Sequence, residues 1–430
     1  MTPQMLDSKF EQLLQELPIE LEKLALEYKA IRRKRKFKSP ADLMRAVLLY
    51  SIGDLSLREI AGWFIGQGSR ISDEGIRLRL HECSDWLKAL IAKMLPQVEL
   101  PNPEGGWKLI ICDGSVLNGP ASKGVDYRYH LSFDPLEQKI SELFLSDAKT
   151  GESLKNFQVS SNSLVLGDRG LAKAPAMIAV RKTGAHLCVR ISPQYLILND
   201  LSGQRFDLIE HLRRARADEP SLTFEVQIQD AKSRETISGY VHARRLSPEA
   251  VNRAKRRIHR RNSSQGSTVK EETLILSEWL LLFTTVPPLV LPAEAIFELY
   301  RVRWQVELLI KKFKSLLKAD ALRAKVGSPL AEVYLLGKLL YGLLTERRAM
   351  ARVTNEWALM ITGRLGTWWR IWKMVAAEIK ESVLNTITWD LLDWREVLSV
   401  LGERKRKRKL QMIPDRVVKW LKGKSITDPI

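Results

Sequence analysis

The sequence predicts a mixed α/β fold in which helical regions precede and follow a central sheet. Residues 1 to about 100 show helical periodicity with no strand pattern, and short apolar or alternating runs begin at Trp107. From Leu330 to Trp394 the pattern is helical again. The central part has four runs of strand type, then a helix and a further strand, an order typical of mixed sheets.

The first helical region contains a candidate DNA-binding unit. In SPADLMRAVLLYSI, Ser39 is the predicted N-cap of a helix and Pro40 its first residue. Farther on, LSLREIAGWF and ISDEGIRLRLHECSDWL are separated by the glycine-bearing break IGQGSR. This pattern is typical of a helix-turn-helix, although any helical hairpin has it. Arginines on or near the second helix favour DNA: Arg70, Arg77 and Arg79.

The central strands carry two aspartates at their predicted ends. WKLIICDGS is an apolar run that ends in Asp113, and SLVLGDRG is a second run that ends in Asp168. Between them, DYRYHLSFD and KISELFLSDA alternate like paired strands. APAMIAVRKTGA then predicts a helix and HLCVRIS a strand.

Residues 200–290 predict a β-rich insertion. Its strand-like runs enclose a basic segment that we expect to be a loop. The runs are LTFEVQIQD, TISGYVHARRL and EETLILSEWLLLFTTV, and the basic segment is RAKRRIHRRNSSQGS.

Composition favours a cytoplasmic protein with a polyanionic partner. The 430 residues include 69 Lys and Arg against 50 Asp and Glu, a net charge of +19. A membrane partner is not expected, because no apolar run reaches the ~18 residues that span a bilayer. The basic runs 32–38, 253–261 and 404–409 are either solvated segments or phosphate-binding ones. Three cysteines, Cys83, Cys112 and Cys188, form no close pair and predict core thiols.

The segment YRVRWQVELLIKKFK, residues 300–314, predicts one helix with an unusual polar stripe. At 100° per residue, Tyr300, Arg303, Glu307 and Lys314 share an arc of about 60°. Trp304 and Lys311 flank this stripe, and the opposite face is apolar: Val302, Val306, Leu309, Phe313 and Leu316. An ordinary solvated ion pair between Arg303 and Glu307 is the alternative interpretation.

Three carboxylates are candidates for a metal site. Asp113 and Asp168 follow predicted central strands and Glu307 projects from a packed helix, although each aspartate alone fits a turn or a helix cap. Converging carboxylates repel one another and persist around divalent cations, and oxygen ligands select Mg²⁺ or Mn²⁺. Two such ions would support in-line phosphoryl transfer.

These residues resemble the motifs of a known family. Asp113-Gly114-Ser115, Asp168-Arg169-Gly170 and the spacing Tyr300-x2-Arg303-x3-Glu307-x6-Lys314 resemble the three conserved regions of DDE transposases of the insertion-sequence-4 type. The resemblance implies a ribonuclease-H-like catalytic core over residues 105–325, interrupted by the β-rich insertion at 200–290. Residues 1–100 would be a helical DNA-binding region, and 330–430 a helical C-terminal region with a basic tail.

The resemblance also implies a role for each residue. Asp113, Asp168 and Glu307 would be the catalytic residues and would hold two Mg²⁺ ions. Tyr300, Arg303, Lys314 and Lys311 would face DNA. Trp279 would stack on a flipped base, and Trp304 would probe the vacated space. The family often has an aromatic residue shortly after the second aspartate, whereas this chain has Leu171 and Ala172.

The expected function is cut-and-paste transposition, with cleavage at terminal inverted repeats through a hairpin intermediate and strand transfer into target DNA. The resemblance implies a homodimer in the synaptic complex and association with the nucleoid while DNA is bound. Two alternatives remain: a structure-selective DNA nuclease that does not join ends, and a catalytically inactive DNA-binding repressor.

Overall fold

The computed structural model describes most of the chain before residue 385. The predicted basic run 404–409 lies outside the described residues, as do residues 32–36 of the run 32–38. The described residues are 3–31, 37–95, 107–119, 122, 124–135, 139–216, 218–264, 266–318, 322–352 and 368–384.

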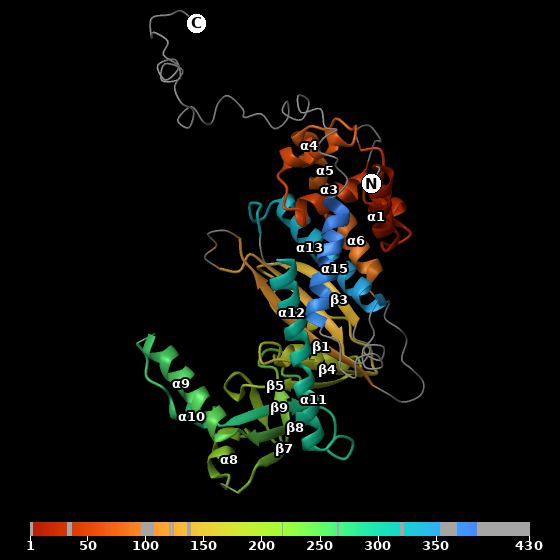
Figure 1. The fold of residues 1–430 in the computed structure, drawn as a ribbon. Helices are drawn as coiled ribbons and strands as arrows, with labels where there is room; N and C mark the ends of the chain where they lie inside the picture. The colour runs from red at the N-terminus through yellow and green to blue at the C-terminus, as the bar shows by residue number, and fades with distance from the viewer. Residues whose placement is uncertain are drawn as a thin grey trace, which may run out of the picture.

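Helices form the first part of the chain, as predicted (Figure 1). Ser39 caps α3, because its hydroxyl accepts a hydrogen bond from the Asp42 amide and the Asp42 carboxylate accepts one from the Ser39 amide. The helices are α1 (Pro3–Gln15), α2 (Leu21–Glu27), α3 (Pro40–Ser51), α4 (Leu57–Gly66), α5 (Asp73–His81) and α6 (Ser84–Met94).

The second helix of the candidate DNA-binding unit was predicted as one element and is two. The helix α5 ends in a tight turn, where the amides of Glu82 and Cys83 bond the carbonyls three residues earlier, and α6 begins after Cys83. Two of its arginines already have acidic partners. Arg77 lies 2.7 Å from Glu74, and Arg79 lies 2.9 Å from Glu82.

A nine-stranded mixed sheet forms the centre of the molecule. Its order is β3-β2-β1-β4-β5-β9-β8-β7-β6, with parallel pairing only between β1 and β4 and between β4 and β5 in the described residues. The strands are β1 (Lys108–Leu117), β2 (Tyr127–Asp134), β3 (Lys139–Asp147), β4 (Ser163–Gly167), β5 (His186–Arg190), β6 (Ile197–Asn199), β7 (Ser221–Gln229), β8 (Thr236–Arg245) and β9 (Trp279–Thr284). This arrangement is a mixed α/β fold consistent with a ribonuclease-H-like core.

Strand β1 continues past Asp113, which was predicted to end it. Parallel pairing with β4 stops at Ile111, whereas antiparallel pairing with β2 runs on to Leu117. Asp113 therefore lies where β1 loses its parallel neighbour, and Asp168 directly follows β4. The two aspartates thus leave the same edge of the parallel pair.

The basic segment predicted as a loop is a helix. It forms most of α9 (Pro248–Ser264), and EETLIL, predicted as strand, is α10 (Glu271–Leu276). Val251, Ala254 and Ile258 recur at helical spacing and are half-buried, so α9 rests one face on the molecule. Strand β9 pairs with both β5 and β8, so strands of the predicted insertion extend the central sheet.

The segment predicted as one helix around Arg303 is two helices, α11 (Ala293–Val302) and α12 (Trp304–Leu317). The amides of Arg303 and Val306 bond carbonyls three residues back, which tightens the chain at the junction. Arg303 still has a helical backbone, with φ −52° and ψ −28°. The remaining helices are α7 (Ala174–Lys182), α8 (Leu208–Arg214), α13 (Pro329–Arg352) and α15 (Trp368–Leu384).

Two apolar cores lie on opposite faces of the sheet (Figure 1). One contains Ile111 of β1 and residues of α3, α6, α12, α13 and α15. The other contains Cys112 together with residues of α7, α8 and β7 to β9. Asp113 continues the row of Leu109 and Ile111, so it faces the helical layer that includes α12. Within the part of the chain that the structure describes, no helix has the length and apolar character needed to cross a membrane.

Candidate functional site

Asp113 is a largely buried carboxylate on β1. Its side chain is 17% exposed, and Oδ1 accepts a hydrogen bond of 2.8 Å from the Gly114 amide. The pKa of Asp113 is raised to about 6, mainly by burial and also by the negative charges of Asp168 and Glu152. The Gly114 hydrogen bond and the charge of Arg303 act in the opposite direction.

Asp168 shapes the turn after β4, the parallel neighbour of β1. Its Oδ1 accepts hydrogen bonds from the amides of Gly170, at 2.8 Å, and Leu171, at 3.2 Å. Asp168 is therefore a turn former, as one of the two interpretations of the sequence expected. Both bonds use one carboxylate oxygen. The side chain of Glu152 lies against both Gly114 and Gly170, so the turn that Asp168 shapes and the backbone after Asp113 are neighbours.

Arg303 links the first and third acidic motifs. Its guanidinium donates a hydrogen bond to Glu307 and lies 4.0 Å from Asp113 Oδ2. The Arg303 side chain is only 15% exposed, so its pair with Glu307 is not the solvated surface pair of the alternative interpretation. The guanidinium also lies 5.7 Å from the centre of the Tyr300 ring, which is half-buried beneath it. Burial raises the pKa of Tyr300 to about 12.

Glu152 is a fourth carboxylate in this group, and sequence reasoning missed it. A Cβ added to Gly114 would lie 3.1 Å from Glu152 Cγ, and one added to Gly170 would lie 3.3 Å from Glu152 Oε2. Glu152 therefore contacts the backbone next to both aspartates. Its side chain also lies 4.0 Å from Arg128 of β2. Glu152 is in a polar loop after β3, and no apolar run or helical spacing identifies it in the sequence.

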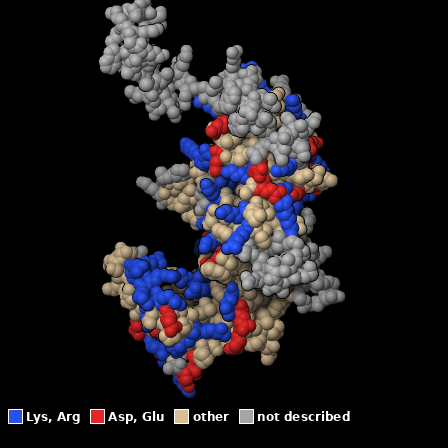
Figure 2. All heavy atoms as spheres, viewed as in Figure 1, with Lys and Arg blue, Asp and Glu red and all other residues tan. Residues whose placement is uncertain are grey.

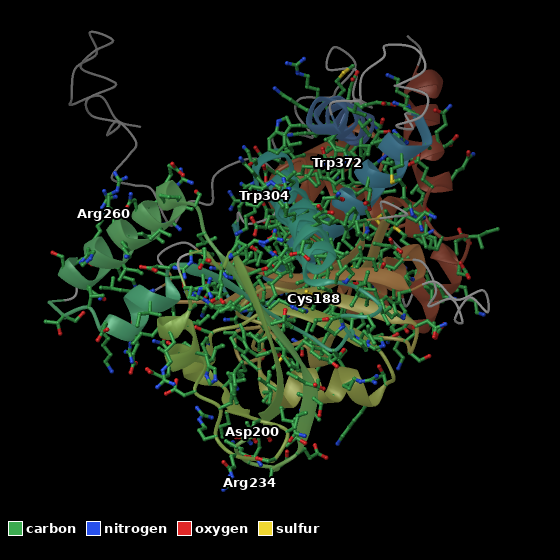
Figure 3. All side chains as sticks on the ribbon, turned by 90° about the horizontal axis from the view of Figure 1, so that it is seen from below. Cys188, Asp200, Arg234, Arg260, Trp304 and Trp372 are labelled. Atoms are coloured by element: carbon green, nitrogen blue, oxygen red, sulfur yellow. The ribbon has the colours of Figure 1, made fainter. Side chains whose placement is uncertain are left out.

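The basic and aromatic residues predicted to face DNA on α12 differ in exposure. Trp304 is 58% exposed and Lys311 is exposed, whereas Lys314 is half-buried. Figure 3 shows Trp304 toward the same side of the molecule as Arg260 of α9. Lys173, which lies just after the second acidic motif, donates a hydrogen bond of 2.8 Å to the Glu152 carbonyl.

Trp279 is not open to solvent. It begins β9, is 3% exposed and belongs to one of the two apolar cores. Its cross-strand neighbour Arg245 covers the ring, with the guanidinium 4.3 Å from the ring centre. Glu278 lies 3.8 Å from Arg245 and holds it there. Base stacking on Trp279 therefore requires Arg245 to move.

The described residues contain no group of three or more His, Cys, Asp or Glu side chains arranged around a common metal position. The positive charge in the site comes from Arg303, whose guanidinium lies between the carboxylates of Asp113 and Glu307. Glu152 lies next to this pair, against the backbone at Gly114 and Gly170.

Known proteins resemble this chain along most of its length. Residues 146–330 match the family model described as transposase DDE domain, a range that includes Asp168 and Glu307 but not Asp113. The InsL protein of insertion sequence element IS186A from Escherichia coli (strain K12) is 30% identical over 335 residues, 76% of this chain and 90% of the relative. The transposase for insertion sequence element IS421 from Escherichia coli is 30% identical over 336 residues, with the same coverage. The transposase for insertion sequence element IS231F from Bacillus thuringiensis subsp. israelensis is 22% identical over 362 residues, 74% of this chain and 75% of the relative.

Proposed function

The chain belongs to the DDE transposase family of insertion sequences, and from this premise we propose that it moves its element by a cut-and-paste reaction. It cleaves DNA at the terminal inverted repeats, through a hairpin intermediate, and joins the freed 3′ ends to target DNA. The proposal includes membership of the insertion-sequence-4 type and action as a homodimer.

One observation carries the proposal. Arg303 contacts both Asp113 and Glu307, although these residues are separated by almost two hundred positions in the sequence. Asp168 follows β4, the parallel neighbour of β1, and Glu152 lies against the backbone after both aspartates, which supports a site that includes all three motifs. A cluster of carboxylates with an arginine and a half-buried tyrosine supports phosphoryl transfer better than a purely structural ion pair does.

The residues fit divalent cations as partners. All the candidate donors are carboxylate oxygens, which suit Mg²⁺ or Mn²⁺. Burial, with a smaller contribution from the negative charges of Asp168 and Glu152, raises the pKa of Asp113, and a bound divalent cation would favour its ionised form. We propose that Asp113, Asp168 and Glu307 hold two ions, and that bound ions supply activation of the attacking oxygen and stabilisation of the leaving oxygen.

Basic and aromatic residues position the DNA in this proposal. Arg303 Nε is buried and has no hydrogen-bond partner in the described part of the chain, so a phosphate oxygen can satisfy it. Lys314, Lys311 and Tyr300 contact neighbouring phosphates. Trp279 stacks on the flipped base after Arg245 moves aside, and Trp304 enters the space that the base leaves.

The test is cleavage and joining of DNA that carries the element's own terminal repeats, in the presence of Mg²⁺. Asp113→Asn, Asp168→Asn and Glu307→Gln should each reduce cleavage by at least about a hundredfold while still shifting the same DNA in a gel. If a variant cleaves DNA as fast as the parent, the substituted residue is not part of the catalytic site. Cleavage without joined product favours the nuclease alternative, and binding without any cleavage by the parent favours the repressor.

A further inference from the structure

The helix α9 carries a dense row of arginines that the catalytic group does not use. It projects from the edge of the molecule beside α10 (Figure 1). Figure 2 shows Lys and Arg gathered over α9, on the side that borders a hollow, with more basic side chains across that hollow. No residue of α9 is buried. The helix therefore presents a large charged surface to solvent.

The two faces of α9 differ sharply. At 100° per residue, the five arginines occupy an arc of about 140°. They are all exposed: Arg253, Arg256, Arg257, Arg260 and Arg261. The half-buried residues form the other face, and they are Val251, Ala254, Lys255, Ile258 and Asn262. The arginines therefore lie on the face that is exposed to solvent, opposite the half-buried face.

The helix is anchored through its inward face. Lys255 lies 2.7 Å from Glu278, the residue before Trp279 at the start of β9, and Glu278 also lies 3.8 Å from Arg245. Glu278 is therefore already shared by two cations. It is not available to neutralise the outward arginines.

Most of the charge on the outer face has no ion pair among the described residues. Among the described residues, no ion pair joins Arg256, Arg257, Arg260 or Arg261 to a carboxylate. The neighbouring arginines of α8 and the loop after it differ, because Arg213 and Arg214 pair with Glu210 and Arg216 pairs with Asp218. Five like charges over two and a half turns repel one another, so the outward face favours a polyanionic partner.

We infer that the outward face of α9 is a docking surface for the phosphate backbone of double-stranded DNA, separate from the carboxylate group around Arg303. This inference rests on the proposed function for its choice of partner. Duplex DNA carries about one phosphate per 1.7 Å of helix axis, which matches a row of closely spaced guanidinium groups, each able to bind phosphate oxygens in a bidentate way. This surface does not distinguish DNA sequences, because contacts with the phosphate backbone do not depend on the identity of the bases.

A membrane is a poorer partner for this helix. An interfacial helix inserts an apolar face into the bilayer, whereas the apolar residues of α9 are half-buried against the protein. The outer face offers charge alone. Binding of anionic vesicles is therefore an outcome that the experiment must separate from DNA binding.

The experiment measures the affinity of the full chain for a duplex without terminal repeats, in EDTA, over a range of salt concentrations. In the variant Arg256→Gln/Arg257→Gln/Arg260→Gln, the slope of log K against log salt should fall by about 0.9 for each arginine that contacts a phosphate. Glutamine keeps helix propensity, and circular dichroism checks that the fold is retained. Because neither cleavage nor terminal repeats are needed, failure here is distinct from failure of the proposed function.

The matched control removes the same number of charges nearby. Arg213→Gln/Arg214→Gln/Arg216→Gln should leave the slope close to that of the parent, because these arginines already pair with carboxylates. Equal effects of the two triple variants would overturn the inference, since net charge alone would then explain binding. An unchanged salt slope in the α9 variant would also overturn the inference. So would a variant that binds DNA like the parent but no longer binds anionic phospholipid vesicles.

Discussion

Arg303 explains why Asp113 and Glu307 coexist in a partly buried place. Two carboxylates near a third and a fourth repel one another, and the guanidinium between them offsets part of that repulsion. The same arginine lies above Tyr300. Arg303 therefore has a structural role before any ligand arrives, and a phosphate or a cation would have to share its carboxylates.

The substitution Arg303→Gln should raise the pKa of Asp113. Arg303 favours the ionised form of that carboxylate, so its removal makes protonation easier. If cleavage needs ionised Asp113, the acid limb of the pH profile of kcat/KM moves to higher pH. Profiles of the parent and the variant on the same DNA measure the shift. A limb that stays in place, or that moves to lower pH, contradicts this role of Arg303.

The substitution Glu152→Gln should have the opposite sign. The negative charge of Glu152 raises the pKa of Asp113, and glutamine keeps the shape of the side chain while it removes the charge. The acid limb should then move to lower pH, with cleavage retained near neutral pH. Movement in the same direction as in Arg303→Gln would show that a distortion of the site, and not charge, controls the profile.

The sequence predicted the residues of this site better than their surroundings. Asp113 and Asp168 follow apolar runs and Glu307 lies at fixed spacing from Tyr300 and Arg303, so each has a local signal. Glu152 has none, because it reaches the site through a loop whose position depends on the pairing of β2 and β3. The periodicity of a sequence does not identify residues that only the tertiary structure brings together.

At the scale of elements, the main error concerned α9. The dense positive charge and the serine and glycine residues at its end favoured a loop, yet Val251, Ala254 and Ile258 recur at helical spacing. Arginine and lysine also have good helix propensity. The charge repulsion along α9 is tolerated because the arginines are exposed to water and the opposite face packs on the molecule.

The position of α12 depends on close contact with α13. Phe313 of α12 is fully buried, and a Cβ added to Gly342 of α13 would lie 2.6 Å from its ring carbon Cζ. The substitution Gly342→Ala should therefore reduce the free energy of unfolding by about 1–3 kcal/mol, although alanine is the better helix former. Denaturant unfolding followed by circular dichroism measures this change.

Two further variants test the cause. Gly75→Ala in α5 should cost less, because the nearest atom to the added carbon is the Ser72 hydroxyl oxygen at 3.2 Å. Phe313→Leu should partly rescue Gly342→Ala, because the smaller side chain leaves room for the methyl group. If the effects of the two substitutions on the free energy of unfolding are additive, the contact between Phe313 and Gly342 does not cause the loss of stability in Gly342→Ala.

At the scale of the whole molecule, one sheet joins the predicted catalytic core to the predicted insertion. Thr284 of β9 pairs with Cys188 of β5 on one side and with Tyr240 of β8 on the other. A local pattern identifies each strand but not its partner, because β9 returns to β5 after almost a hundred residues. The boundaries 105–325 and 200–290 remain predictions, and the continuous sheet suggests that the two parts unfold together.

A substitution at the junction tests this cooperativity. A Cβ on Gly239 of β8 would lie 2.7 Å from Phe283 Cζ and would also meet the carbonyl oxygen of Thr284, so Gly239→Ala should force β8 away from β9. Under conditions that report global opening, amide hydrogen exchange should become faster in β4 and β5 as well as in β7 and β8, because β9 connects the two pairs. Faster exchange confined to β7 and β8 would show that the insertion unfolds as its own unit. In that case the docking surface on α9, which is anchored through Glu278 at the start of β9, could change position without disturbing the carboxylates around Arg303.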